Sequence, residues 1–122
     1  MTACLVLRRL PFQAGQNLIL AEAAALVAWA TENHLDADPA TWILADRERR
    51  ELEVGIGLPA PPTDLPSGLR VVSAPTGSGE LHDLCFDSFR TGPARWFRID
   101  HDPERGHPIA ATAHDPSSTA HT

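Results

Sequence analysis

The chain has 122 residues, a mass of 13.2 kDa and a formal net charge of −6. This length allows one domain with one hydrophobic core, and the acidic balance argues against binding nucleic acid or anionic membranes through bulk charge. All ten basic residues are arginines and tyrosine is absent. Chemistry that needs a lysine Schiff base, a phosphate-loop lysine or a phenol is therefore excluded.

The first 58 residues predict a strand, a helix and two further strands. The apolar run Cys4–Leu10 ends at Pro11, which has no backbone donor, and is typical of a strand. Residues 18–33 lack Gly and Pro and predict a helix. This helix is so apolar that a sheet, a partner chain or both must cover it. Residues 41–45 predict a second strand, and the strict alternation of Glu51–Leu58 predicts a half-buried antiparallel strand.

The second half begins after a proline-rich joint at residues 59–68. We expect a strand at 69–74, a short helix at 80–89, and strands at 94–100 and 108–113. The helix is predicted to turn Leu81, Leu84 and Cys85 inward. Residues 1–116 then form a single domain, and residues 117–122 are expected to be a disordered tail.

The two halves, residues 3–58 and 69–113, share the order strand, helix, strand, strand. Both predicted hairpins turn on a charged segment that begins with Asp, at residues 46–49 and 102–105. A β-α-β-β unit cannot bury its own sheet face, whereas two units side by side can. The predicted fold class is therefore α+β: duplicated β-α-β-β units form one antiparallel sheet with two helices on one face and a groove along their pseudo-twofold axis.

This pattern resembles the gyrase-inhibitor-like (GyrI-like) effector-binding domains. The similar features are Arg9-Leu10-Pro11, the strand 52–59 before the joint, residues 68–75 before a glycine-led helix, and the segment 96–103 with its Asp-Pro turn. The resemblance implies binding of bulky aromatic or cationic small molecules in the central groove. The family carries a buried Glu in its penultimate strand, where this chain has Phe97, so the counter-charge for a cationic ligand is lost there.

Five residues are candidates for the ligand site: Trp42, Glu53, Gly55, Trp96 and Phe97. The two tryptophans open equivalent strands and either sandwich a flat ligand or serve as core aromatics. Glu53 lies on the polar face of its strand, where it either pairs with a ligand or is a surface charge. Gly55 marks a sheet bend or the close approach of a ligand or of another backbone.

The sequence gives less support to a metal site or to a disulfide. Histidines recur at positions 101, 107, 114 and 121, but without helical metal-ligand spacing, and we expect no metal and no cofactor. Cys4 and Cys85 form no C-x-x-C pair and are expected to be buried thiols. No signal-peptide pattern occurs, which predicts a cytoplasmic protein.

The leading hypothesis is a non-catalytic protein that binds a hydrophobic or aromatic small molecule, as a stand-alone sensor or sequestering protein. It would bind neither nucleic acid nor membrane directly. One alternative is a small hydrolase that uses a groove Glu as general base. The other is a homodimeric interaction protein that associates through the apolar first helix, or one with a different protein partner.

Overall fold

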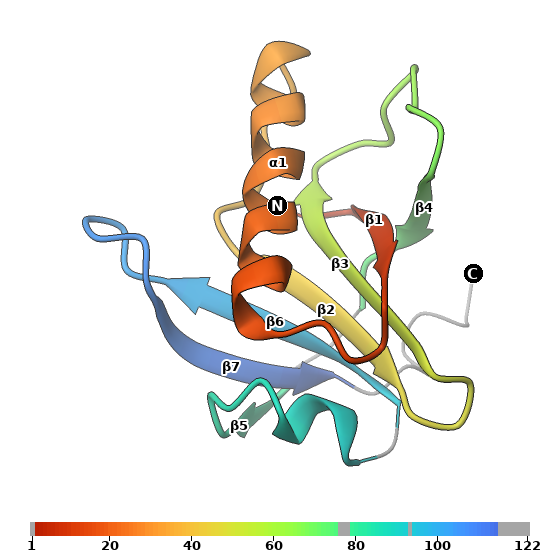
Figure 1. Ribbon diagram of the computed structural model, residues 1–122. Coiled ribbons are helices and arrows are strands. Elements are labelled where there is room, and N and C mark those ends of the chain that lie inside the picture. Colours follow the sequence, from red (N-terminus) through yellow and green to blue (C-terminus); the bar gives the residue numbers. More distant parts are fainter. Residues whose placement is uncertain (1, 76–78, 93, 115–122) are drawn as a thin grey trace.

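The computed structural model describes residues 2–75, 79–92 and 94–114. These residues form one antiparallel sheet of seven strands in the order β4-β1-β3-β2-β6-β7-β5, with α1 packed against one face (Figure 1). The elements are β1 Cys4–Leu10, α1 Gln16–Glu32, β2 Thr41–Asp46, β3 Glu51–Leu58, β4 Leu69–Ser73, β5 Glu80–His82, the 3-10 turn η1 Ser88–Arg90, β6 Arg95–His101 and β7 Pro108–His114.

Two hairpins with the same turn chemistry form the centre of the sheet. In the β2–β3 turn, Asp46 Oδ1 accepts the backbone N–H groups of Glu48 and Arg49. In the β6–β7 turn, Asp102 Oδ1 accepts the backbone N–H groups two and three residues later. The residue after each turn has a positive φ, 53° at Arg50 and 78° at Gly106. Both turns predicted from the sequence are therefore confirmed, because the side chain of the leading Asp can replace the missing backbone partners.

The predicted second helix is wrong, and with it the predicted fold class. Among the described residues α1 is the one α-helix, while residues 80–89 form the short strand β5 and the start of η1. β5 pairs with the free edge of β7. The burial is the reverse of the prediction: Leu81, Leu84 and Cys85 are exposed, whereas Phe86 and Phe89 are buried. Strand pairing and the burial of two phenylalanines thus outweigh local helix propensity.

The strand expected to open the second half lies elsewhere in the sheet. β4 was to be the counterpart of β1, but it pairs antiparallel with β1 at the outer edge. Residues 59–68 therefore link β3 to β4 on one side of the sheet and do not lead to a second helix-bearing unit. The strand order β1-β3-β2-β6-β7-β5 is nevertheless symmetric about the β2–β6 pair, and Trp42 and Trp96 lie one position before the paired residues Ile43 and Phe97.

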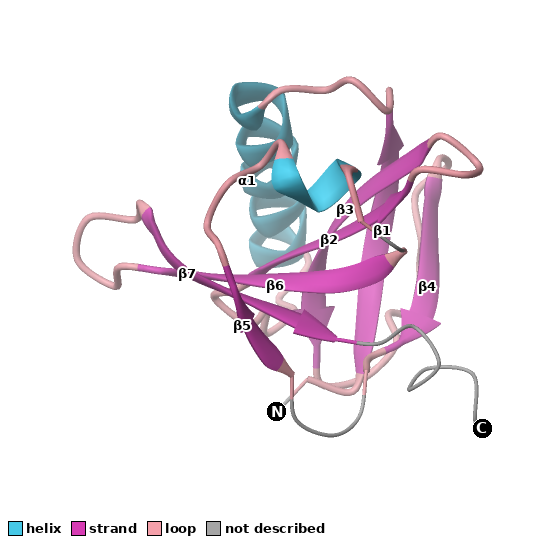
Figure 2. Ribbon diagram, turned by 90° about the horizontal axis from the view of Figure 1, so that it is seen from below, coloured by secondary structure: helices cyan, strands magenta, loops and turns pink. Residues whose placement is uncertain are grey.

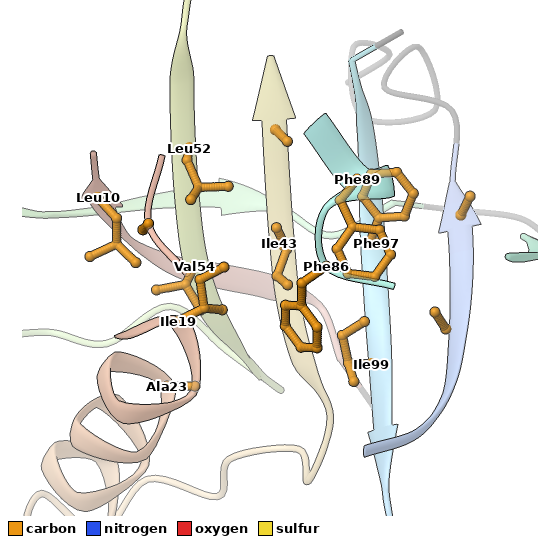
Figure 3. Close-up of a cluster of buried hydrophobic side chains, with 14 residues drawn as sticks. Leu10, Ile19, Ala23, Ile43, Leu52, Val54, Phe86, Phe89, Phe97 and Ile99 are labelled. Carbon is orange, nitrogen blue, oxygen red and sulfur yellow. The ribbon is translucent and has the colours of Figure 1, made fainter. Parts of the chain in front are cut away.

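The main core lies between the sheet and α1 (Figure 3). The side chains of α1 that face the sheet are Ile19, Ala23, Leu26 and Ala30, spaced as one helical stripe. They meet the residues of β1, β2 and β3 that point to this face. At the β6 end of the sheet α1 is replaced as cover by Phe86 and Phe89, which pack on Phe97 and Ile99. No helix within the described ranges is long and apolar enough to cross a membrane.

The sheet is strongly twisted, and its second face is also largely covered. Figure 2 shows β6 and β7 running across the direction of β1 and β4. Seven flat strands at about 4.8 Å spacing would separate the outer strands by about 29 Å. The seven steps from Ser73 to Glu80 reach at most about 25 Å. Because this connection joins the two outer strands, the sheet must curl. Leu5 and Leu7, on the face away from α1, are 0% exposed as a result.

Candidate functional site

The structure places four of the five predicted site residues on one face of the sheet. Trp42, Glu53, Gly55 and Trp96 share the face away from α1, as the strand registers require. Phe97 points to the opposite face, where it stacks on Phe89 with ring centroids 4.5 Å apart. The five residues therefore do not form one site, and Phe97 is a core residue.

The two tryptophans are packed into a small apolar cluster with Leu5, Leu7 and Ala74. Each is 4% exposed, so a flat ligand would have to open the cluster to reach them. Trp42 Nε1 and both ring nitrogens of His114 are buried and have no hydrogen-bond partner among the residues that the structure describes, and the two rings lie 5.5 Å apart. Burial, together with the charge of Arg98, lowers the pKa of His114. The observed contacts match the core-aromatic alternative for the two tryptophans.

Gly55 lies between Leu7 on β1 and Trp42 on β2. A Cβ atom at this position would overlap the backbone carbonyl oxygen of Val6 and lie 2.5 Å from Leu7 Cδ2. The glycine thus allows the close approach of another backbone, one of the outcomes expected for it.

Glu53 is a buried carboxylate, 3% exposed. Both of its oxygens accept hydrogen bonds from Arg70, Oε2 from Nε at 2.7 Å and Oε1 from Nη2 at 2.5 Å. Arg70 lies on β4, so this pair bridges across β1. The hydrogen bonds to Glu53 raise the pKa of Arg70. The cation that neutralises Glu53 is thus part of the chain, and the carboxylate is buried and held by Arg70 rather than presented to a substrate.

A groove of about 620 Å³ lies on the other face of the sheet. One wall is the side of α1 that does not face the sheet, formed by Leu20, Ala24 and Val27, with Ala23 at its edge. The opposite wall is the β6–β7 turn, which projects beside α1 (Figure 1). The floor contains Thr41 at the start of β2 and His101 at the end of β6. The volume lies within the range of small-molecule pockets.

The β6–β7 turn is held in shape by the chain's own hydrogen bonds. Asp102 N donates to His107 O, and Gly106 N donates to Asp102 O, each at 2.8 Å. The hydrogen bonds that Asp102 accepts from the backbone of Glu104 and Arg105 lower its pKa. This wall of the groove is therefore an ordered turn with an ionised carboxylate at its base.

A polar pair lies on the groove floor. Thr41 Oγ1 and His101 Nε2 are 2.7 Å apart, and His101 Nδ1 is 3.1 Å from Gly106 O. Since a carbonyl oxygen only accepts, Nδ1 carries a proton. In the tautomer that has its proton on Nδ1 alone, Nε2 accepts a hydrogen bond from the Thr41 hydroxyl. The Gly106 carbonyl thus favours the tautomer whose Nε2 lone pair is directed at the hydroxyl of Thr41, a residue that is 6% exposed and lines the groove.

Sequence reasoning missed this groove. It treated His101 as one of a series of solvated histidines and did not consider Thr41. Two signals pointed toward it: the helix at 18–33 is apolar on more than the side that faces the sheet, and its alanines leave room beside it. Neither signal identifies the opposite wall, because Thr41 and His101 are 60 residues apart and meet only through the β2–β6 pairing.

The described histidines do not converge. No group of three or more metal-ligating side chains that could hold an ion occurs in residues 2–75, 79–92 and 94–114. His121 and the predicted tail at 117–122 lie outside the described residues.

Comparison with known proteins identifies no relative of this chain. No protein-family model matches the sequence, and neither the curated proteins nor the solved structures contain a significant match. The similarity to GyrI-like domains stays a prediction.

Proposed function

We propose that this protein binds a small, mainly apolar molecule in the groove between α1 and the β6–β7 turn. The observation that carries the proposal is the composition of this groove: aliphatic side chains along α1, and a few polar groups on the floor and in the facing turn. Ligand pockets combine these two features, because apolar walls provide affinity while a few polar groups orient the ligand. Val27 is 43% exposed, so apolar surface is available to be covered.

The proposal keeps the expected class of function and moves the site. The tryptophan-lined site on the far face is closed, and its carboxylate is paired with Arg70. A hydrolase that uses Glu53 as general base is not supported for the same reason. Homodimerisation through α1 would use Leu18 and Val27, its two exposed large apolar residues.

The test is a binding assay with N-phenyl-1-naphthylamine, a neutral fluorophore that brightens in apolar sites, followed by competition with flat aromatic compounds. Ala24→Leu fills the groove wall and is expected to weaken dye binding by about tenfold or more. Ala25→Leu adds the same volume on an exposed side of α1 outside the groove and should leave binding unchanged. Equal dye binding by both variants would contradict the proposal. If the wild-type protein gives no dye signal and its mass in solution depends on concentration, the homodimer would be favoured.

A further inference from the structure

The polar pair on the groove floor has the arrangement of an activated nucleophile. A hydroxyl becomes nucleophilic when a general base lies within hydrogen-bond distance and a third group fixes the orientation of that base. Here Thr41 supplies the hydroxyl, His101 Nε2 accepts from it at 2.7 Å, and Gly106 O holds the opposite ring nitrogen. The third position is occupied by a backbone carbonyl, which fixes the same tautomer that a carboxylate would.

We propose that Thr41 and His101 form an acyl-transfer site that acts on esters or thioesters of apolar acids. The substrate class follows from the surroundings. The groove wall beside the pair is formed by Leu20, Ala24 and Val27, which suits an aliphatic or aromatic acyl chain, and both Thr41 and His101 line the same space. The inference rests on the proposed function, because it needs the groove to be the ligand site.

The reaction has two balanced steps. In the first, Thr41 Oγ1 attacks the carbonyl carbon and its proton passes to His101 Nε2. The bond to the leaving alcohol or thiol breaks, and the leaving group takes this proton, which leaves an acyl ester on Thr41. In the second, water attacks the acyl carbon and gives a proton to His101 Nε2. The bond to Thr41 breaks, Oγ1 recovers the proton and the free acid departs.

A structural role is the competing explanation for the same hydrogen bond. Thr41 and His101 lie at the adjoining ends of two paired strands, and a hydroxyl–imidazole contact there can simply satisfy two polar groups. A structural contact predicts a change in stability alone. An acyl-transfer site predicts a covalent adduct on a single, named oxygen.

The experiment uses p-nitrophenyl butyrate and octanoate with the full chain, and follows nitrophenolate release, intact mass and the modified residue by peptide mapping. We expect an adduct of one acyl group on Thr41. Thr41→Val keeps the side-chain shape and should lower the acylation rate by about 100-fold or more, as should His101→Gln. Thr41→Ser should retain acylation. His107→Gln removes an exposed imidazole from the same turn and controls for uncatalysed reaction with free histidine.

The outcomes separate the two proposals. Dye binding in the groove without any adduct on Thr41 would overturn the acyl-transfer site and leave the binding function intact. Acylation at other residues, or at equal rates in wild type and Thr41→Val, would do the same. Absence of dye binding in the wild-type protein would overturn the binding function, and the acyl-transfer inference with it. Melting temperatures of all variants, measured in parallel, show whether any lost reaction reflects unfolding.

Discussion

At the scale of single residues, Glu53 shows how one buried charge depends on its partner. The carboxylate is 3% exposed, whereas the Arg70 side chain is 52% exposed. Removing Arg70 leaves a buried charge without its two hydrogen bonds, while replacing both residues removes the desolvation problem altogether. The ion pair therefore specifies how β4 sits against β1 more than it stabilises the fold.

We expect Arg70→Met to lower the free energy of unfolding by about 2 kcal/mol, a moderate value because water can reach the exposed side of the pair. Combining it with Glu53→Leu should recover most of that loss. Urea unfolding followed by tryptophan emission measures both. The control is Arg9→Met, which breaks the exposed pair with Glu51 and should cost less than about 1 kcal/mol. Equal effects of the two single substitutions would show that Glu53 is already solvated.

His114 gives the protein a predictable response to acid. Its pKa is lowered from 6.5 in the folded state, by burial and by Arg98. Above pH 6.5 the ring is neutral in both the folded and unfolded states, so His114 has no effect on stability there. As the pH falls below 6.5, the unfolded chain takes up the proton first, and stability is lost until the folded-state pKa is reached.

The expected loss is at most about 1.4 kcal/mol per pH unit. His114→Phe keeps an aromatic ring beside Trp42 and should flatten the stability profile between pH 6.5 and 5. His107→Gln, at an exposed histidine away from Trp42, is the control substitution. Thermal unfolding across this pH range tests the difference between the variants. Parallel profiles for wild type and His114→Phe would contradict a buried neutral imidazole.

At the scale of elements, local patterns predicted what local forces determine. The alternation in Glu51–Leu58 correctly predicted the strand β3 and the face of each residue, because side chains alternate along a strand. The predicted half-burial was wrong, since both faces of β3 are buried. Asp46 and Asp102 predicted both hairpin turns because the side chain bonds the backbone two and three residues ahead. Such signals lie within a few residues of one another and need no knowledge of the rest of the chain.

Residues 80–89 were predicted wrongly because their conformation depends on distant partners. Glu80–His82 becomes a strand because β7 offers an unpaired edge, and Phe86 and Phe89 turn inward because β6 presents Phe97 where α1 does not reach. The groove was missed for the same reason, since its walls come from α1 and from a turn about 80 residues later. For Glu53 and Gly55, the alternation of the sequence predicted which face of the sheet each residue lies on. It could not predict that this face is buried.

At the scale of the whole molecule, the sheet is held together from its centre outward. β3 lies between β1 and β2 and is buried along seven of its eight residues. β5 has three residues, pairs with β7 alone, and carries Leu81 with 88% of its surface exposed. Local opening costs least where few buried contacts are lost, so β5 should open without the rest of the sheet.

Native-state hydrogen exchange tests this order. We expect the amides of β1, β2, β3 and β6 to exchange only through global unfolding, and those of β5 to exchange roughly 100-fold faster. The short connection from Ser73 to Glu80 opposes the local opening of β5, because it links β5 covalently to β4 at the opposite edge of the sheet. If β5 amides are as protected as those of β3, that tie couples the two edges. The curled sheet would then unfold as one cooperative unit, with its edges as stable as its centre.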